Sequence, residues 1–190
     1  MATRRIKMSD AVTAKLKELA AQASGTVKIG FIDSDQAPIA FWNEFGHKGR
    51  FPAPPRPFFR TMVANDSPKW PEMMASKLRR THMDGKQTLR EMGEHIDGEL
   101  KESITKLESP PLSKTTLRLR LKFGNHPEKI RARDVVQAQR EVAAGAPVAS
   151  GTEEKPLIWT GMMRKSTEYQ VNMGPIMRYD IESSQYKERA

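Results

Sequence analysis

The longest regular pattern in the chain is KQTLREMGEHIDGELKESITKL, residues 86–107. Its apolar residues recur every three or four positions, which is the spacing that places side chains on one face of a helix. These residues are Leu89, Met92, Ile96, Leu100, Ile104 and Leu107. Pro110 and Pro111 follow, and they cannot continue a helix because proline has no amide hydrogen. The pattern therefore predicts one long amphipathic helix.

Strand signals lie on both sides of this helix. The stretch TVKIGFID, residues 26–33, alternates apolar side chains with polar or small ones, as a half-buried strand does. Residues 165–171 and 175–181 predict a hairpin around a turn at 172–174. The hairpin could pair with the strand at Val27.

Capping residues and apolar spacing predict several shorter helices. They cover residues 10–24, 38–45, 57–64, 70–80, 112–122 and 128–144. Gly46 is expected to stop the helix at 38–45, and Ser113 to cap the helix at 112–122. Residues 145–155 are small and polar, a composition typical of a mobile loop.

Composition limits the class of protein. A chain of 190 residues with 37% hydrophobic residues and a mean hydropathy of −0.65 is typical of one soluble domain with a modest core. It has no apolar run of about 18–20 residues, so no membrane span is expected. No apolar run follows the basic start either, so the protein is expected to be made and kept in a cytoplasm. The absence of cysteine excludes disulfides and thiolate metal sites.

The positive charge is concentrated in one segment. The net charge is +9, and the segment from Lys114 to Arg140 contains eight basic residues against two acidic ones. Its candidate contact residues are Arg118, Arg120, Lys122, Lys129, Arg131 and Arg133. One interpretation is a solvated helix face. The other is a contact with an acidic protein or a passing duplex, because clustered cations neutralise phosphates. Phe123 is the segment's only aromatic residue, so the stacking surface of a single-strand binder is missing.

Nothing in the sequence indicates catalysis. The four histidines are scattered without the spacing of a metal site, and no glycine-rich phosphate loop or dinucleotide turn occurs. We therefore expect a protein that is not an enzyme, with no catalytic residues, no cofactor and no metal.

Two adjacent segments are rich in aromatic residues and proline. They are IAFWNEFG, residues 39–46, and PAPPRPFFR, residues 52–60. The prolines are expected to keep residues 47–57 extended, with neither helix nor strand ladder. One interpretation is a small core under a loop. The other is an arm that contacts a neighbouring subunit, because aromatic residues and arginine are enriched at contact centres. The candidate interface residues are Trp42, Phe45, Phe51, Arg56, Phe58, Phe59 and Arg60.

Four motifs in a fixed order carry a resemblance to a known family. They are AFWNEFG at 40–46, PPRPFFR at 54–60, PLSKTT at 111–116 and PLIWTGMMRKS at 156–166. The set resembles the head-to-tail joining proteins of tailed bacteriophages, also called tail-completion, neck, collar or minor tail proteins. The family often has aspartate where Trp159 stands, and residues 124–155 resemble a helical, basic insertion in the single domain 1–190.

The resemblance implies a fold and a role. The fold is α+β, with a small antiparallel or mixed β-sheet packed against a long helix, an extended loop arm and a helical insertion. The role is that of a structural virion protein in the neck, in a homo-oligomeric ring of six or, less favoured, twelve copies. Its expected neighbours are the head-side connector or portal and the tail-tube or tail-terminator proteins, and double-stranded DNA passes through the lumen without sequence readout. Two alternatives stay open: a basic DNA-binding protein and a tail-tube terminator ring.

Overall fold

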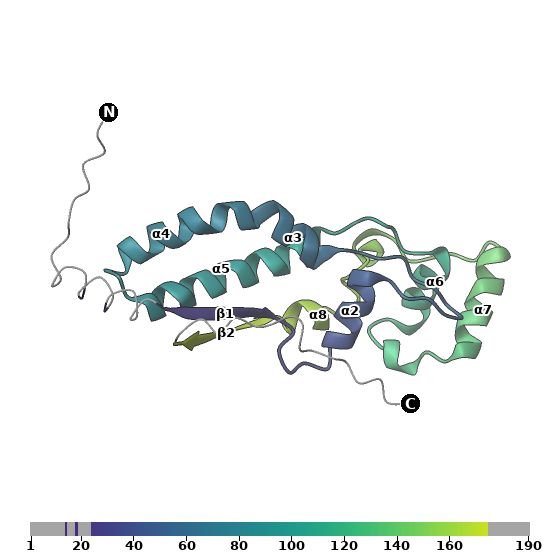
Figure 1. The fold of residues 1–190 in the computed structure, drawn as a ribbon. Coiled ribbons are helices and arrows are strands. Elements are labelled where there is room, and N and C mark those ends of the chain that lie inside the picture. Colours follow the sequence, from purple (N-terminus) through teal and green to yellow (C-terminus); the bar gives the residue numbers. More distant parts are fainter. Residues whose placement is uncertain (1–13, 15–17, 19–23, 175–190) are drawn as a thin grey trace.

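Helix α5 (Gly85–Lys106) lies between a small sheet and a layer of helices in the computed structural model, which describes residues 14, 18 and 24–174 (Figure 1). Strands β1 (Gly25–Gly30) and β2 (Glu168–Met173) face one side of α5. Helices α3 (Phe58–Asp66) and α4 (Trp70–Arg80) face the other. The fold is α+β, with a small antiparallel sheet packed against the long helix, as expected.

The sheet pairs the two ends of the described chain. β1 and β2 are antiparallel, with Val27 opposite Val171, so the predicted pairing at Val27 is confirmed. The predicted turn at 172–174 is wrong for its first two residues, because Asn172 and Met173 continue the ladder opposite Thr26 and Gly25. The predicted strand at 175–181 lies outside the described residues.

The remaining elements are α2 (Ala37–Phe45), the 3-10 turn η1 (Ser67–Lys69), α6 (Lys114–Phe123), η2 (Pro127–Lys129), α7 (Ala132–Ala143), η3 (Gly151–Glu154) and α8 (Met162–Lys165). Among them, α2, α6 and α7 correspond to predicted helices, whereas η1, η3 and α8 were not predicted. Helix α7 begins later than predicted, because residues 127–129 form a 3-10 turn instead. Residues 14 and 18 are helical, residue 24 is not, and the rest of the helix predicted at 10–24 lies outside the described residues.

The core forms around the apolar stripe of α5. Leu89, Met92, Ile96, Leu100 and Ile104 are all buried, and Leu107 packs against them, so the predicted stripe is confirmed. Other elements complete the same core with Ala40, Phe58, Met62, Leu157 and Met163. The sheet lies close against α5 at Gly93, where a Cβ would lie 2.3 Å from the Tyr169 ring.

Residues 124–155 form η2, α7 and η3, and α7 packs against α6 at the end of the molecule remote from α4 (Figure 1). Residues 145–155, expected to be a mobile loop, contact the rest of the fold: Ala149 is buried, and its backbone amide donates to the Leu117 carbonyl at 3.3 Å. The status of residues 124–155 as an insertion stays a prediction.

Candidate interface built from the four motifs

The buried carboxylate of Glu44 joins the first motif to the second. It accepts the backbone amides of Phe59 at 2.9 Å and Arg60 at 3.1 Å, which are orphan donors in the first turn of α3. Pro57, at the cap position of α3, supplies no side-chain hydrogen bond. Glu44 therefore caps α3 from a different helix.

Arg60 completes this junction from the surface. Its Nε donates to Glu44 Oε1 at 2.8 Å, and its Nη2 donates to the Glu44 carbonyl at 3.0 Å. The same guanidinium lies 4.7 Å from the centre of the Phe45 ring, within the range of a cation–π contact. Arg60 thus links α2 and α3 while its side chain stays more than half exposed.

Arg56 joins the second motif to the third. Its Nε donates to the Pro110 carbonyl at 3.1 Å and its Nη2 to the Pro111 carbonyl at 3.3 Å. The side chain is buried, and this desolvation lowers the pKa of Arg56. The planar guanidinium of Arg56 binds both carbonyls at once, and it therefore holds the loop that follows α5 against the arm.

Arg120 joins α6 to the fourth motif. Its Nη1 donates to the Lys155 carbonyl at 2.9 Å and its Nη2 to the Pro156 carbonyl at 3.0 Å. The guanidinium also lies 5.2 Å from the centre of the Trp159 ring. Trp159 in turn donates its indole N–H to the Gly124 carbonyl at 2.5 Å. Trp159 thus contacts both Arg120 and the backbone that follows α6.

The four motifs line one open groove of about 1250 Å³. Its walls come from α2, the arm, residues 111–116 and residues 156–163. Lining residues include Ile39, Pro54, Pro111, Leu157, Trp159 and Met162. Motifs separated by up to about a hundred residues in the sequence therefore meet at one place.

Helix α2 carries an exposed apolar surface, named here the aromatic face: Ile39, Phe41, Trp42 and Phe45. These four side chains are between 43% and 58% exposed. Phe41 and Phe45 lie 4.8 Å apart between ring centres, and Trp42 meets His47 edge-on at 6.2 Å. Trp42 and Phe45 were predicted interface residues, whereas Ile39 and Phe41 were missed. Their spacing of three or four residues from Trp42 and Phe45 was the available signal.

The structure corrects the prediction for Phe58 and places the other two predicted aromatic residues, Phe51 and Phe59. Phe58 is 1% exposed and packs edge-on against Phe31 at 6.2 Å, and Phe59 is half-buried against the same core. Buried Arg56 is likewise turned inward. Neither Arg56 nor Phe58 offers surface to a neighbour, so the interpretation as a small core holds for them. Phe51 is half-buried beneath Arg50, whose guanidinium lies 5.5 Å from the ring centre.

The arm is more ordered than predicted. His47 and Ala53 form an isolated antiparallel bridge, with each amide donating to the other carbonyl at 3.0 Å. Gly46 ends α2 with φ of 76°, and a Cβ there would meet the Pro55 nitrogen at 2.8 Å. The expectation that no ladder forms at 47–57 is wrong, because neither residue of this bridge is a proline and both have an amide to donate.

Internal ion pairs occupy part of the predicted basic surface. Glu141 of α7 binds Arg118 Nε at 2.7 Å and Lys122 Nζ at 2.8 Å. Hydrogen bonds from Lys122, Arg118 and Gln137 lower the pKa of Glu141 to about 2. Arg120 is buried, so it is corrected from a surface residue to an internal one.

The other three predicted cations, Lys129, Arg131 and Arg133, are exposed, and no ion pair involves them in the part of the chain that the structure describes. Of the six predicted contact residues, these three are therefore the ones open to a polyanion without breaking an internal ion pair.

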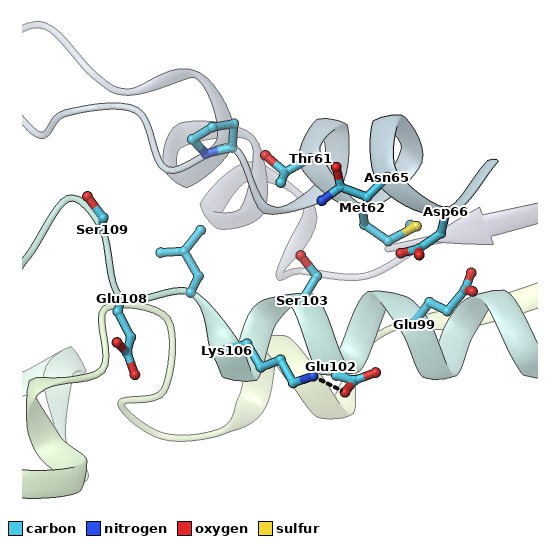
Figure 2. Close-up of a pocket in the computed structure, with 12 residues that line it drawn as sticks. Thr61, Met62, Asn65, Asp66, Glu99, Glu102, Ser103, Lys106, Glu108 and Ser109 are labelled. Carbon is cyan, nitrogen blue, oxygen red and sulfur yellow. Dashed lines mark ion pairs between the residues drawn. The ribbon is translucent and has the colours of Figure 1, made fainter. Parts of the chain in front are cut away.

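A second hollow of about 500 Å³ lies between α3, α5 and residues 107–109 (Figure 2). We name it the acidic groove, because Asp66, Glu99, Glu102 and Glu108 line it. Among these, Glu99 accepts the Trp70 indole N–H at 2.9 Å, and Glu102 pairs with Lys106. The sequence patterns did not indicate this groove.

Comparisons with known proteins found no similar protein. No family model matches the sequence, no curated protein matches it, and no solved structure matches the fold. Within residues 24–174 together with 14 and 18, no cluster of acidic or histidine side chains has the make-up of a metal site. None of the described helices is both long and apolar enough to cross a membrane.

Proposed function

We propose that the chain is a structural subunit of the ring that joins the head of a tailed bacteriophage to its tail, and that it catalyses no reaction. The observation that carries the proposal is the convergence of the four family-like motifs. Glu44, Arg56, Arg60 and Arg120 tie them together through hydrogen bonds, so the motif residues act as one structural unit.

The ring would form by burial of apolar surface. The aromatic face leaves four large side chains in solvent, and aromatic residues contribute most to binding when they are buried at a contact. Rotational symmetry gives every copy the same contact with the next, in a ring of six or twelve copies. Connector or portal proteins would lie on the head side of this ring, and tail-tube or terminator proteins on the tail side.

DNA that passes through the ring would contact it without sequence-specific recognition. Lys129, Arg131 and Arg133 are exposed cations, which attract phosphates regardless of sequence. A tail-tube terminator shares the ring form one layer lower, and it would be distinguished by its position in the particle.

The test is a phage that carries Trp42→Ser with Phe45→Ser. Both side chains are exposed, so the purified variant should fold, unlike a variant of buried Phe58. We expect filled heads and separate tails in electron micrographs, because the ring loses its apolar contact. The matched control is Leu121→Ser, which removes an equally exposed apolar side chain from α6. Normal infectious particles from the double variant would contradict the proposal.

A further inference from the structure

We propose that the ring closes when the aromatic face and the basic residues after it dock in the acidic groove of a second copy of the chain. This inference rests on the proposed function and names the contact that would build the ring. It joins two open surfaces of the same molecule that carry opposite charges.

The first surface combines anchors with positive charge. Trp42 and Phe45 project from the aromatic face, and Arg60 covers one side of Phe45. Exposed His47, Lys48 and Arg50 follow at the end of the helix. The acidic residues Asp33 and Asp35 precede α2, at its opposite end. The carboxyl end of α2 and the arm therefore present aromatic rings beside cations.

The second surface has an apolar lining and an acidic rim. Pro57, Met62 and Leu107 contribute apolar surface. The four carboxylates named above surround it, and the two lysines nearby, Lys69 and Lys106, already pair with Asp66 and Glu102. Glu108 is exposed and has no ion pair with any described residue. The groove is thus acidic in a chain whose net charge is +9.

Size and charge support the match. A hollow of about 500 Å³ falls within the range of about 300–1000 Å³ for sites that bury organic ligands, so it can admit an aromatic anchor such as Trp42. Opposite charges around such an anchor steer the encounter and fix its register. No residue lines both surfaces: the first comes from α2, residues 47–50 and Arg60, and the second from Pro57, later residues of α3, α5 and residues 107–109.

The symmetry of the contact follows from this separation. When two different patches meet, the assembly still has a free aromatic face at one end and a free acidic groove at the other, so further copies can add. A rotation that closes then gives a ring without any further surface. The contact is therefore head-to-tail.

The test uses two variants of the full chain, each defective in one surface. Trp42→Glu damages the aromatic face, and Glu102→Lys with Glu108→Lys damages the acidic groove. We expect sedimentation velocity to show concentration-dependent association of the wild-type chain. For each variant alone, the dissociation constant should rise at least about tenfold, since a central anchor or reversed charges are lost.

Mixing the variants is the decisive step. The intact groove of the first should bind the intact aromatic face of the second, giving a one-to-one dimer that grows no further. Leu121→Glu and Glu94→Lys are the matched controls, because both residues are exposed and lie outside the two surfaces. Both controls should associate like the wild-type chain, and thermal denaturation should show that all the variants fold.

Three results would overturn the inference: a wild-type chain that stays monomeric up to about millimolar concentration, a variant that associates like wild type, or a mixture that forms no dimer. If this association test fails but the chain is found at the head–tail junction, the proposed function is retained and only the inferred contact is wrong. A one-to-one dimer from a chain that is missing from phage particles would overturn the proposed function alone.

Discussion

Glu44 is the residue on which the junction between α2 and α3 depends. Its carboxylate accepts two backbone amides and the Arg60 guanidinium, although its side chain is almost fully removed from solvent. Burial of a carboxylate is costly unless each oxygen has partners, and here both do. The exposed aromatic face is therefore held at a fixed angle to α3.

We expect Glu44→Ala to lower the free energy of unfolding by about 1–3 kcal/mol, because it removes a helix cap and leaves two partly buried amides unpaired. Glu44→Gln should cost less, since its amide oxygen still accepts one amide. Chemical denaturation measures both, with the exposed Glu94→Ala as the control. Equal stability of the Glu44→Ala and Glu94→Ala variants would show that the cap contributes nothing.

The roles of Arg56 and Arg120 could not be predicted from the sequence. Arg56 and Arg120 were predicted at contact surfaces, yet each binds two carbonyls far away in the chain. Such partners become neighbours only after the chain has folded, so no local spacing reveals them. Trp42 and Phe45 were predicted as contact residues, and the structure places them in solvent, where that role stays a prediction.

At the scale of elements, the approach of the sheet to α5 requires a glycine at position 93. A Cβ at Gly93 would lie 2.3 Å from Cδ2 of Tyr169, closer than atoms can pack. We expect Gly93→Ala to lower the free energy of unfolding by about 1–3 kcal/mol through overpacking. Gly98 lies on the same helix, and a Cβ there would meet no atom within 4 Å, so Gly98→Ala should stabilise the protein by up to about 1 kcal/mol. Equal effects in thermal denaturation would contradict this packing.

The pairing of α6 with α7 depends on pH through Glu141. Its pKa falls from 4.5 to about 2 in the folded chain, because Lys122, Arg118 and Gln137 donate hydrogen bonds to the carboxylate. A lowered folded pKa adds stability above pH 4.5, and this contribution is lost as the pH falls from about 4.5 through about 2. The difference in unfolding free energy between wild type and Glu141→Gln should therefore shrink over that range. A difference that is independent of pH would contradict it.

The elements that depend on local patterns were predicted well. The stripe of α5 needs only its own spacing, and Ser113 caps α6 as expected, with its hydroxyl accepting the Thr116 amide at 3.1 Å. Errors arose where a distant partner decides the outcome. Asn172 and Met173 form a strand instead of a turn because β1 extends far enough to pair with them. The bridge between His47 and Ala53 closes a loop that the prolines alone would leave open.

At the scale of the whole molecule, internal ion pairs determine how much of the positive charge can act on a partner. Of the basic segment, Arg118 and Lys122 are held by Glu141, whereas Arg131 and Arg133 are exposed. Each phosphate contact contributes about −0.9 to the slope of log affinity against log salt concentration on duplex DNA.

For any duplex binding by the chain, Arg131→Gln with Arg133→Gln should therefore make this slope shallower by up to about 1.8. Arg118→Gln with Lys122→Gln should change it much less, because those cations are already paired. Filter binding or fluorescence anisotropy at several salt concentrations measures both. Equal changes would favour the rival interpretation, a basic protein that binds DNA with the whole segment.

The proposed function is tested most directly by asking whether the chain lies at the head–tail junction of phage particles. The measurement is cryo-electron microscopy of purified phage particles in which this chain carries a compact tag. We expect the tag density at the head–tail junction, repeated around the axis as a closed ring. Particles that lack the chain, or tag density confined to the capsid shell or the distal tail, would contradict the account.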